Sequence, residues 1–163
     1  MPDTVLGGIA PERVWRFFEE ISQIPRCSQN EDQVRDYLKK FAEDRQLKSV
    51  QDEVGNIVIK KPATKGSEKA KGVVLQGHMD MVCEKNANTQ HDFSKDPIKL
   101  VKDGDWLKAD GTTLGADNGI AVAMALAVLD SDDIQHGPIE ALFTTDEESG
   151  LTGALGLDPS IID

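Results

Sequence analysis

Two segments near the amino terminus repeat apolar residues at the spacing of an amphipathic helix. The first lies between Pro11 and Pro25, and its apolar positions are Val14, Phe17, Phe18, Ile21 and Ile24. The second, residues 32–47, has its apolar stripe at Val34, Tyr37, Leu38 and Phe41. Ser28 and Glu31 precede it at the spacing of a capping box, so we expect them to cap this second helix.

The middle of the chain changes to patterns typical of strands and turns. Residues 48–60 contain a Gly-Asn pair before a β-branched run, which predicts two strands or a strand pair. The lysine-rich residues 60–72 then indicate a solvated loop. Residues 98–111 predict a hairpin that turns around Asp103 and Gly104.

Residues 118–131 are apolar nearly all round and rich in alanine, which predicts a buried helix packed against a sheet. The apolar runs at 73–76 and 139–145 predict strands before and after it. Helices that alternate with apolar strands indicate a layered α/β fold. In such a fold, functional side chains collect at the carboxyl ends of the strands.

Composition narrows the class of protein. A chain of 163 residues with 39 % hydrophobic residues is long enough for one folded domain, and its net charge of -11 disfavours nucleic acid and anionic lipid as partners. No apolar run reaches membrane-span length and residues 1–10 lack signal-peptide character, so we expect a cytoplasmic protein. Cys27 and Cys83 fit neither a CxxC pair nor a disulfide framework, and we expect each to be a packing residue.

The first of three polar clusters follows the strand at 73–76. His78 and Asp80 are two residues apart, so they point to the same side if the extended backbone continues. A neutral imidazole is a good zinc ligand, and the carboxylate either binds metal or holds the ring in the right tautomer. An ordinary hydrogen-bonded histidine is the alternative, which this triplet alone does not exclude.

The second cluster lies just before the buried helix. Asp117 stands in a turn where Gly115 and Gly119 let backbone approach a bound group closely. Alternatively, Asp117 or Asn118 caps the helix.

The third cluster is the acidic run Asp146, Glu147 and Glu148 at the end of an apolar strand, which fits a cation site or a general base. Adjacent residues of an extended segment point in opposite directions, so a sharp turn is needed for both glutamates to face one pocket. We expect Ser149 and Gly150 to supply it.

Together these clusters favour zinc, manganese or cobalt, because they offer one imidazole, several carboxylates and few thiols. The motifs of serine hydrolases, of phosphate-binding loops and of HExxH zinc proteases are absent from the sequence.

In this order, the motifs "LQGHMDMV", "LGADNGIAVA" and "FTTDEESG" resemble the di-zinc metallopeptidases that include aminoacylases, peptidase T and the carnosinases. The resemblance implies a three-layer α/β/α catalytic domain with a mixed central sheet. It also implies that residues 1–163 form only the amino-terminal part of that domain. The rest of the domain and a lid or dimerisation domain are expected outside this chain, as is a homodimer formed through that domain.

Carried over by motif, the resemblance assigns roles to five residues. His78 becomes a terminal ligand of one zinc, Asp117 the carboxylate that bridges two Zn²⁺, and Glu148 a ligand of the second. Asp80 orients the His78 ring, and Glu147 is the general base. Mn²⁺ or Co²⁺ are possible substitutes for zinc. The family also implies a cis peptide bond after Asp117.

The implied activity is hydrolysis of unblocked dipeptides, and the first two motifs are most similar to those of enzymes that act on carnosine-like Xaa-His. The isolated chain of 163 residues is expected to be inactive. The alternatives are a tripeptidase or aminoacylase of the same family, and a non-catalytic fragment that binds metal or a partner.

Overall fold

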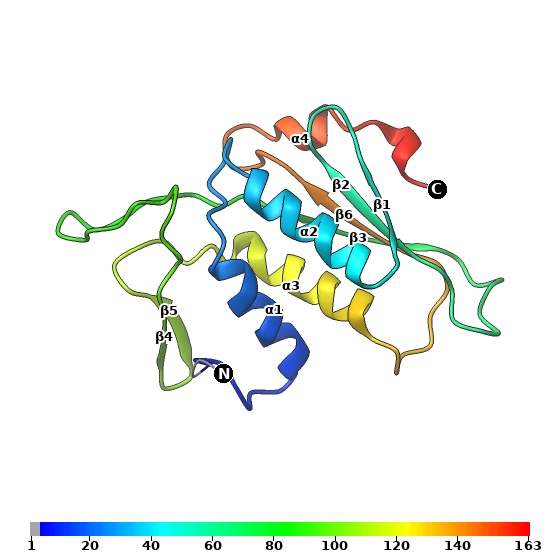
Figure 1. Ribbon diagram of the computed structural model, residues 1–163, viewed down its shortest axis with the longest axis horizontal. Coiled ribbons are helices and arrows are strands. Elements are labelled where there is room, and N and C mark those ends of the chain that lie inside the picture. The colour runs from blue at the N-terminus through cyan, green and yellow to red at the C-terminus, as the bar shows by residue number, and fades with distance from the viewer. Residues whose placement is uncertain (1–3) are drawn as a thin grey trace.

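The computed structural model describes residues 4–163, and every element predicted above is present in it (Figure 1). In chain order the elements are α1 Glu12–Ser22, α2 Asp32–Asp44, β1 Lys48–Gln51, β2 Ile57–Lys61, β3 Val73–His78, β4 Leu100–Asp103, β5 Trp106–Ala109, α3 Ala116–Asp130, β6 Ile139–Thr144, α4 Thr152–Leu155 and the 3-10 helix η1 Pro159–Ile161.

The main sheet has four strands in the order β1-β2-β6-β3. β1 pairs with β2, and β2 with β6, in antiparallel fashion, whereas β3 runs parallel to β6. The sheet is therefore mixed, as expected. Because β3 and β6 are parallel neighbours, their carboxyl ends lie side by side at one edge of the sheet.

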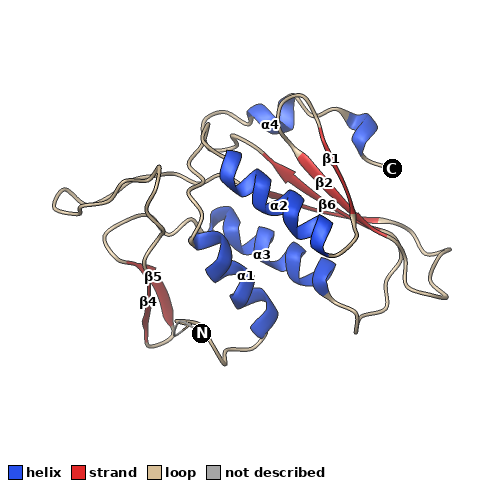
Figure 2. Ribbon diagram, in the orientation of Figure 1, coloured by secondary structure: helices blue, strands red, loops and turns tan. Residues whose placement is uncertain are grey.

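The long helices α1, α2 and α3 all cover one face of the sheet (Figure 2). The opposite face carries a small cluster in which Ile161 of η1 packs on Val58 of β2 and Leu142 of β6. The mixed α/β architecture is thus confirmed. Within residues 4–163, the layer on this second face consists of the short segment around η1.

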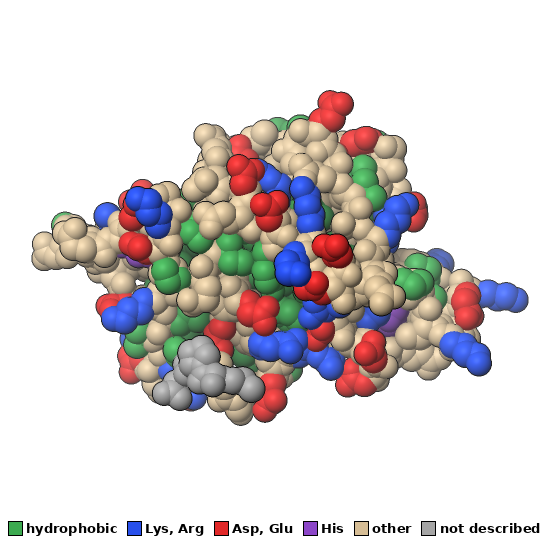
Figure 3. Space-filling view, viewed as in Figure 1, with side chains coloured by type: hydrophobic (Ala, Val, Ile, Leu, Met, Phe, Trp, Pro, Cys, Tyr) green, Lys and Arg blue, Asp and Glu red, His purple; other side chains and the backbone are tan. Residues whose placement is uncertain are grey.

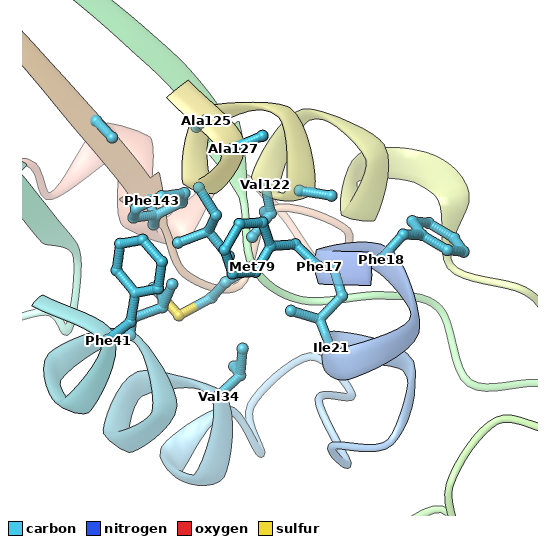
Figure 4. Close-up of a cluster of buried hydrophobic side chains, with 14 of the residues drawn as sticks. Phe17, Phe18, Ile21, Val34, Phe41, Met79, Val122, Ala125, Ala127 and Phe143 are labelled. Carbon is cyan, nitrogen blue, oxygen red and sulfur yellow. The ribbon is translucent and has the colours of Figure 1, made fainter. Parts of the chain in front are cut away.

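The main core lies between the three helices and the sheet, and Met79 is at its centre (Figure 4). Met79 is fully buried near Phe17 and Phe143, and its backbone N–H donates to the carbonyl of Thr144 at 2.8 Å. The residue that follows β3 is therefore held by core packing and by β6. This fixes the backbone between His78 and Asp80.

The β4–β5 hairpin stands apart from the main sheet and turns at Gly104, whose φ is 58°. Residues 62–72 form the expected loop. On the face shown in Figure 3, acidic and basic side chains are interspersed. Among residues 4–163, no helix has both the length and the apolar composition needed to cross a bilayer.

The expectation that Cys27 and Cys83 are separate packing residues is wrong, because the two form a disulfide with Cα atoms 5.6 Å apart. A β-bridge between Cys27 and Met81 brings their segments together. The bond ties the segment after β3 to the loop between α1 and α2. A separation of 56 residues gives no local pattern from which this pairing follows.

The capping box predicted for Ser28 and Glu31 is also wrong. Glu31 precedes α2, but it makes no side-chain cap hydrogen bond. Its Oε1 accepts from the backbone N–H groups of Gln29 at 3.1 Å and Asp146 at 2.9 Å. The Ser28 hydroxyl donates to Asp80 Oδ2 at 2.7 Å. Both side chains are therefore bound to segments distant in the sequence.

Tyr37 joins α2 to α1, because its hydroxyl donates to Glu20 Oε2 at 2.7 Å. Burial, reinforced by that carboxylate, raises the pKa of Tyr37 above its usual 10.0. The unfolded chain therefore loses this proton at a lower pH than the folded protein. We expect this group to reduce the free energy of unfolding by about 1.4 kcal/mol for each pH unit above the ordinary tyrosine pKa.

Urea unfolding between about pH 9 and pH 11 checks this expectation against Tyr37→Phe, which has no proton to lose. The wild type should lose stability more steeply with pH than the variant. Equal slopes would contradict the assignment.

Candidate metal centre

The three polar motifs meet at the edge where β3 and β6 end. His78 closes β3 and pairs with Thr144, the last residue of β6. His78 Nε2 lies 3.1 Å from Asp117 Oδ1 and 3.7 Å from Glu147 Oε2. His78, Asp117 and Glu148 each offer one ligand atom within 4.8 Å of the others. The predicted site residues are therefore brought together in space.

Burial differs sharply within this group. The side chain of His78 is only 6 % exposed, whereas that of Glu147 is 33 % and that of Asp117 is 85 % exposed. Glu148 is also exposed. The imidazole is thus fixed by packing at the floor of the site, and the carboxylates stand at its open side. A solute can reach them from solvent.

Asp80 lies behind the imidazole and is fully buried. His78 Nδ1 is 3.2 Å from both Asp80 Oδ1 and the Asp80 carbonyl. Both of these atoms are acceptors, so Nδ1 carries a proton, and Nε2 is turned toward the carboxylates.

Asp80 also binds the acidic turn. Its two carboxylate oxygens accept from the backbone N–H groups of Glu147 and Glu148, each at 3.1 Å. Burial by itself would raise the pKa of the Asp80 carboxyl, but hydrogen bonds from His78, Ser28 and these two amides outweigh it. The pKa is held well below its usual range, and Asp80 remains an anion.

The turn that aims the two glutamates comes earlier than predicted. Asp146 already adopts a positive φ of 47°, ahead of the turn expected at Ser149 and Gly150. The Asp146 side chain is buried and accepts from the Thr152 hydroxyl at 2.6 Å. The run of three acids therefore divides, with the first directed into the protein and the next two toward His78.

A second group of acids lies beneath this turn. Glu31, Asp80 and Asp146 are all buried, and one carboxylate oxygen from each lies within 4.8 Å of the others. Glu31 and Asp80 accept the N–H groups of three consecutive residues, 146 to 148. These contacts fix the backbone that carries Glu147 and Glu148.

The charges of His78, Asp117 and Glu148 suit a divalent cation. Burial opposes the charged form of His78, but the hydrogen bonds to Asp80 and Asp117 outweigh it and raise its pKa to about 9. Burial also raises the pKa of Glu148; the nearby His78 opposes this shift, and the charges of Glu147 and Asp117 add to it. The carboxylates that hold a proton on the ring can hold a cation in its place. An imidazole with carboxylates fits zinc, manganese or cobalt.

Asp117 is held in an irregular start of α3. Gly115 has a left-handed φ of 70°, and Asp117 and Asn118 have non-helical backbone angles. The peptide bond between Asp117 and Asn118 is cis, as the family resemblance implies. No side-chain cap hydrogen bond is made at this helix start, so the capping interpretation of Asp117 or Asn118 is not supported.

Sequence reasoning missed three residues that hold the site from below. The sequence pattern predicts a helix cap for Ser28 and Glu31 and indicates no role for Arg26. Arg26 is buried and donates to backbone carbonyls next to His78 and near Asp117. The available signal is a cluster of polar residues between two predicted helices, which does not by itself indicate a distant partner.

A mixed α/β fold with an imidazole and carboxylates gathered at the carboxyl edge of its sheet is an arrangement that suits a metal-dependent enzyme. The sequence pattern of Peptidase family M20/M25/M40 matches residues 74–161, and the chain belongs to this family of hydrolases. That match covers all three motifs.

Individual relatives support the same membership. The chain is 51 % identical over 152 residues to the cytosol non-specific dipeptidase of Escherichia coli, covering 93 % of the chain and 31 % of that protein. The crystal structure of aminoacylhistidine dipeptidase from Vibrio alginolyticus has 51 % identity and a TM-score of 0.92, with 94 % of this chain and 31 % of that one covered. A tripeptidase structure from Staphylococcus aureus has 29 % identity and a TM-score of 0.76, covering 96 % of this chain and 42 % of that one.

The chain therefore spans about a third of the length of the two relatives that are half identical to it.

Proposed function

We propose that the complete protein hydrolyses the peptide bond of unblocked dipeptides, preferentially Xaa-His, with two Zn²⁺ ions. In this proposal, residues 1–163 are the amino-terminal part of the catalytic domain. The observation that carries it is the convergence of His78, Asp117, Glu147 and Glu148. The names of the two half-identical relatives, both dipeptidases, support the substrate class.

The proposed ligands are His78 for one ion, Asp117 as the bridge and Glu148 for the second ion. When bound, the two ions would polarise the scissile carbonyl and lower the pKa of a water molecule. Asp80 keeps the proton on His78 Nδ1, so Nε2 remains free to bind.

Glu147 is proposed as the general base. Its carboxylate lies on the open side of the site, 3.7 Å from His78 Nε2. From there it can take a proton from the attacking water and deliver it to the leaving amine.

Asp117→Ala in the complete protein tests the metal assignment. Because the bridge serves both ions, we expect zinc content to fall from two ions to one or none, and hydrolysis to fall with it. Metal analysis after gel filtration checks this result. The matched control is Asp44→Ala, an exposed carboxylate paired with Lys40 on α2, which should keep both ions. Unchanged zinc in Asp117→Ala would contradict the bridging role.

Substrate class is tested by comparing hydrolysis of Ala-His, a tripeptide and an N-acetyl amino acid by the complete protein. Faster turnover of Ala-His supports the dipeptidase. Faster turnover of either of the others supports a tripeptidase or an aminoacylase. Zinc binding without any turnover would support a non-catalytic metal-binding protein.

We further propose that the protein acts in the cytoplasm on small peptides and forms a homodimer through a domain outside this chain. The name of the Escherichia coli relative supports the location. The Cys27–Cys83 disulfide argues against a cytoplasmic location, because a reducing cytosol keeps most thiols unpaired.

A further inference from the structure

Arg26 lies in the loop between α1 and α2 and is only 2 % exposed. Its Nη1 donates to the carbonyl oxygens of Met79 and Asp80, each at 3.2 Å. Its Nη2 donates to the carbonyl oxygen of Gly115 at 2.6 Å. One guanidinium therefore joins the backbone just after His78 to the backbone two residues before Asp117.

The space for this guanidinium is made by two glycines. A Cβ atom on Gly115 would lie 2.6 Å from Arg26 Nη2, and one on Gly119 would lie 2.7 Å from it. A side chain at either position would push the guanidinium away from its acceptors. The close approach of Arg26 is therefore one reason for a glycine on each side of Asp117; at Gly115 a Cβ atom would also lie 2.6 Å from Met81 Sδ.

The buried charge is kept without a carboxylate in direct contact in the described part of the chain. Burial lowers the pKa of Arg26 to about 10, and the nearby charge of Asp80 opposes that shift. The partners that Arg26 does have are the three carbonyl oxygens. A buried cation is costly, so an apolar side chain would be the simpler way to fill this space. What the guanidinium adds is a bond to each of two segments.

We propose that Arg26 is a positioning residue that sets the separation of His78 and Asp117, and with it how well these two side chains would hold the ion that they share. The proposal rests on the proposed function, because it assumes that those side chains bind metal. A guanidinium is a rigid planar fork, so donors on its two ends hold their acceptors at a fixed distance. The observed 3.1 Å between His78 Nε2 and Asp117 Oδ1 is the separation that it maintains.

Two substitutions in the complete protein separate this role from simple packing. Arg26→Lys keeps the charge and most of the length, but its single ammonium cannot reproduce the fork. Arg26→Met fills the space without charge or donors. The matched control is Arg16→Lys, which alters an arginine of α1 that binds Asp130 on the protein surface.

The probe is Co²⁺ titrated into metal-free protein, followed by its visible absorption. For Arg26→Lys we expect affinity for one of the two ions to fall by about 10- to 100-fold, the range seen when a residue that supports metal ligands is removed. The Co²⁺ spectrum should change in shape, because the coordination geometry changes. For Ala-His hydrolysis, kcat should fall by a similar factor while KM changes little. Arg16→Lys should match the wild type in all three measurements.

Arg26→Lys with wild-type Co²⁺ affinity and spectrum would overturn the proposal, as would an equal weakening in Arg16→Lys. If Arg26→Met fails to unfold cooperatively, Arg26→Lys decides the question alone. A wild type that binds two Co²⁺ but does not hydrolyse dipeptides would overturn the proposed function only. The spectrum and affinity of Arg26→Lys would still decide the role of Arg26.

Discussion

Changing Glu147 to alanine in the complete protein is expected to slow dipeptide hydrolysis by about a thousandfold while both metal ions are retained. A positioned general base contributes rate factors of about 10² to 10⁴. Glu147 stands next to the proposed ligands, and its backbone is fixed by Asp80. Its removal should therefore leave the ligand set unchanged.

Steady-state kinetics and metal analysis on the same preparation check both parts of this expectation. Glu148→Ala is the matched comparison, because Glu148 is adjacent to Glu147 and is a proposed metal ligand. This variant should lose metal together with activity. A Glu147→Ala protein that hydrolyses Ala-His within about tenfold of the wild type would contradict its assignment as the base. Loss of zinc from Glu147→Ala would instead make it a ligand.

The second large effect is expected for Asp80→Ala, which should lower the free energy of unfolding by about 3–5 kcal/mol, the range for removing one partner of a buried charge. The change leaves three groups without their acceptor: the hydroxyl of Ser28 and the amides of Glu147 and Glu148. The imidazole of His78 loses its carboxylate partner and keeps only the Asp80 carbonyl. The imidazole and the acidic turn should then move independently.

Urea unfolding of the complete, metal-free protein measures this loss without a contribution from bound ions. Ser28→Ala is the graded control, since it removes a single hydrogen bond to the same carboxylate and should cost about 1.5 kcal/mol. Equal losses in the two variants would contradict the view that Asp80 holds several segments at once. Metal affinity should follow the same order, with Asp80→Ala the weaker.

The motifs themselves could be read from the sequence because each is local. A β-branched apolar run predicts a strand, and an alanine-rich apolar run predicts a buried helix. Polar residues that directly follow a predicted strand are then expected at its carboxyl end. His78 and Asp80 illustrate this, because strand spacing alone puts them on one side. The helical pattern around Phe17 and Phe41 likewise follows from residues within a few turns.

The support beneath the site could not be read in this way. Ser28 and Glu31 have the spacing of a capping box, yet their oxygens bind Asp80 and the amide of Asp146. A buried amide without a partner costs more than an exposed one at a helix start, so the distant contact prevails. Arg26 and the Cys27–Cys83 pair depend on equally distant segments, which no local pattern records.

The contacts that build the metal centre span most of the chain. His78 and Asp117 are 39 residues apart, Asp80 and Glu147 are 67 apart, and Glu31 and Asp146 are 115 apart. Each closes a long loop, so the centre exists only after the whole chain has assembled.

An ion that binds only the assembled state stabilises it by mass action, by about 4 kcal/mol at a thousand times its dissociation constant. If the proposed ions bind, the supply of metal would therefore set the free energy of unfolding of the protein as well as its activity.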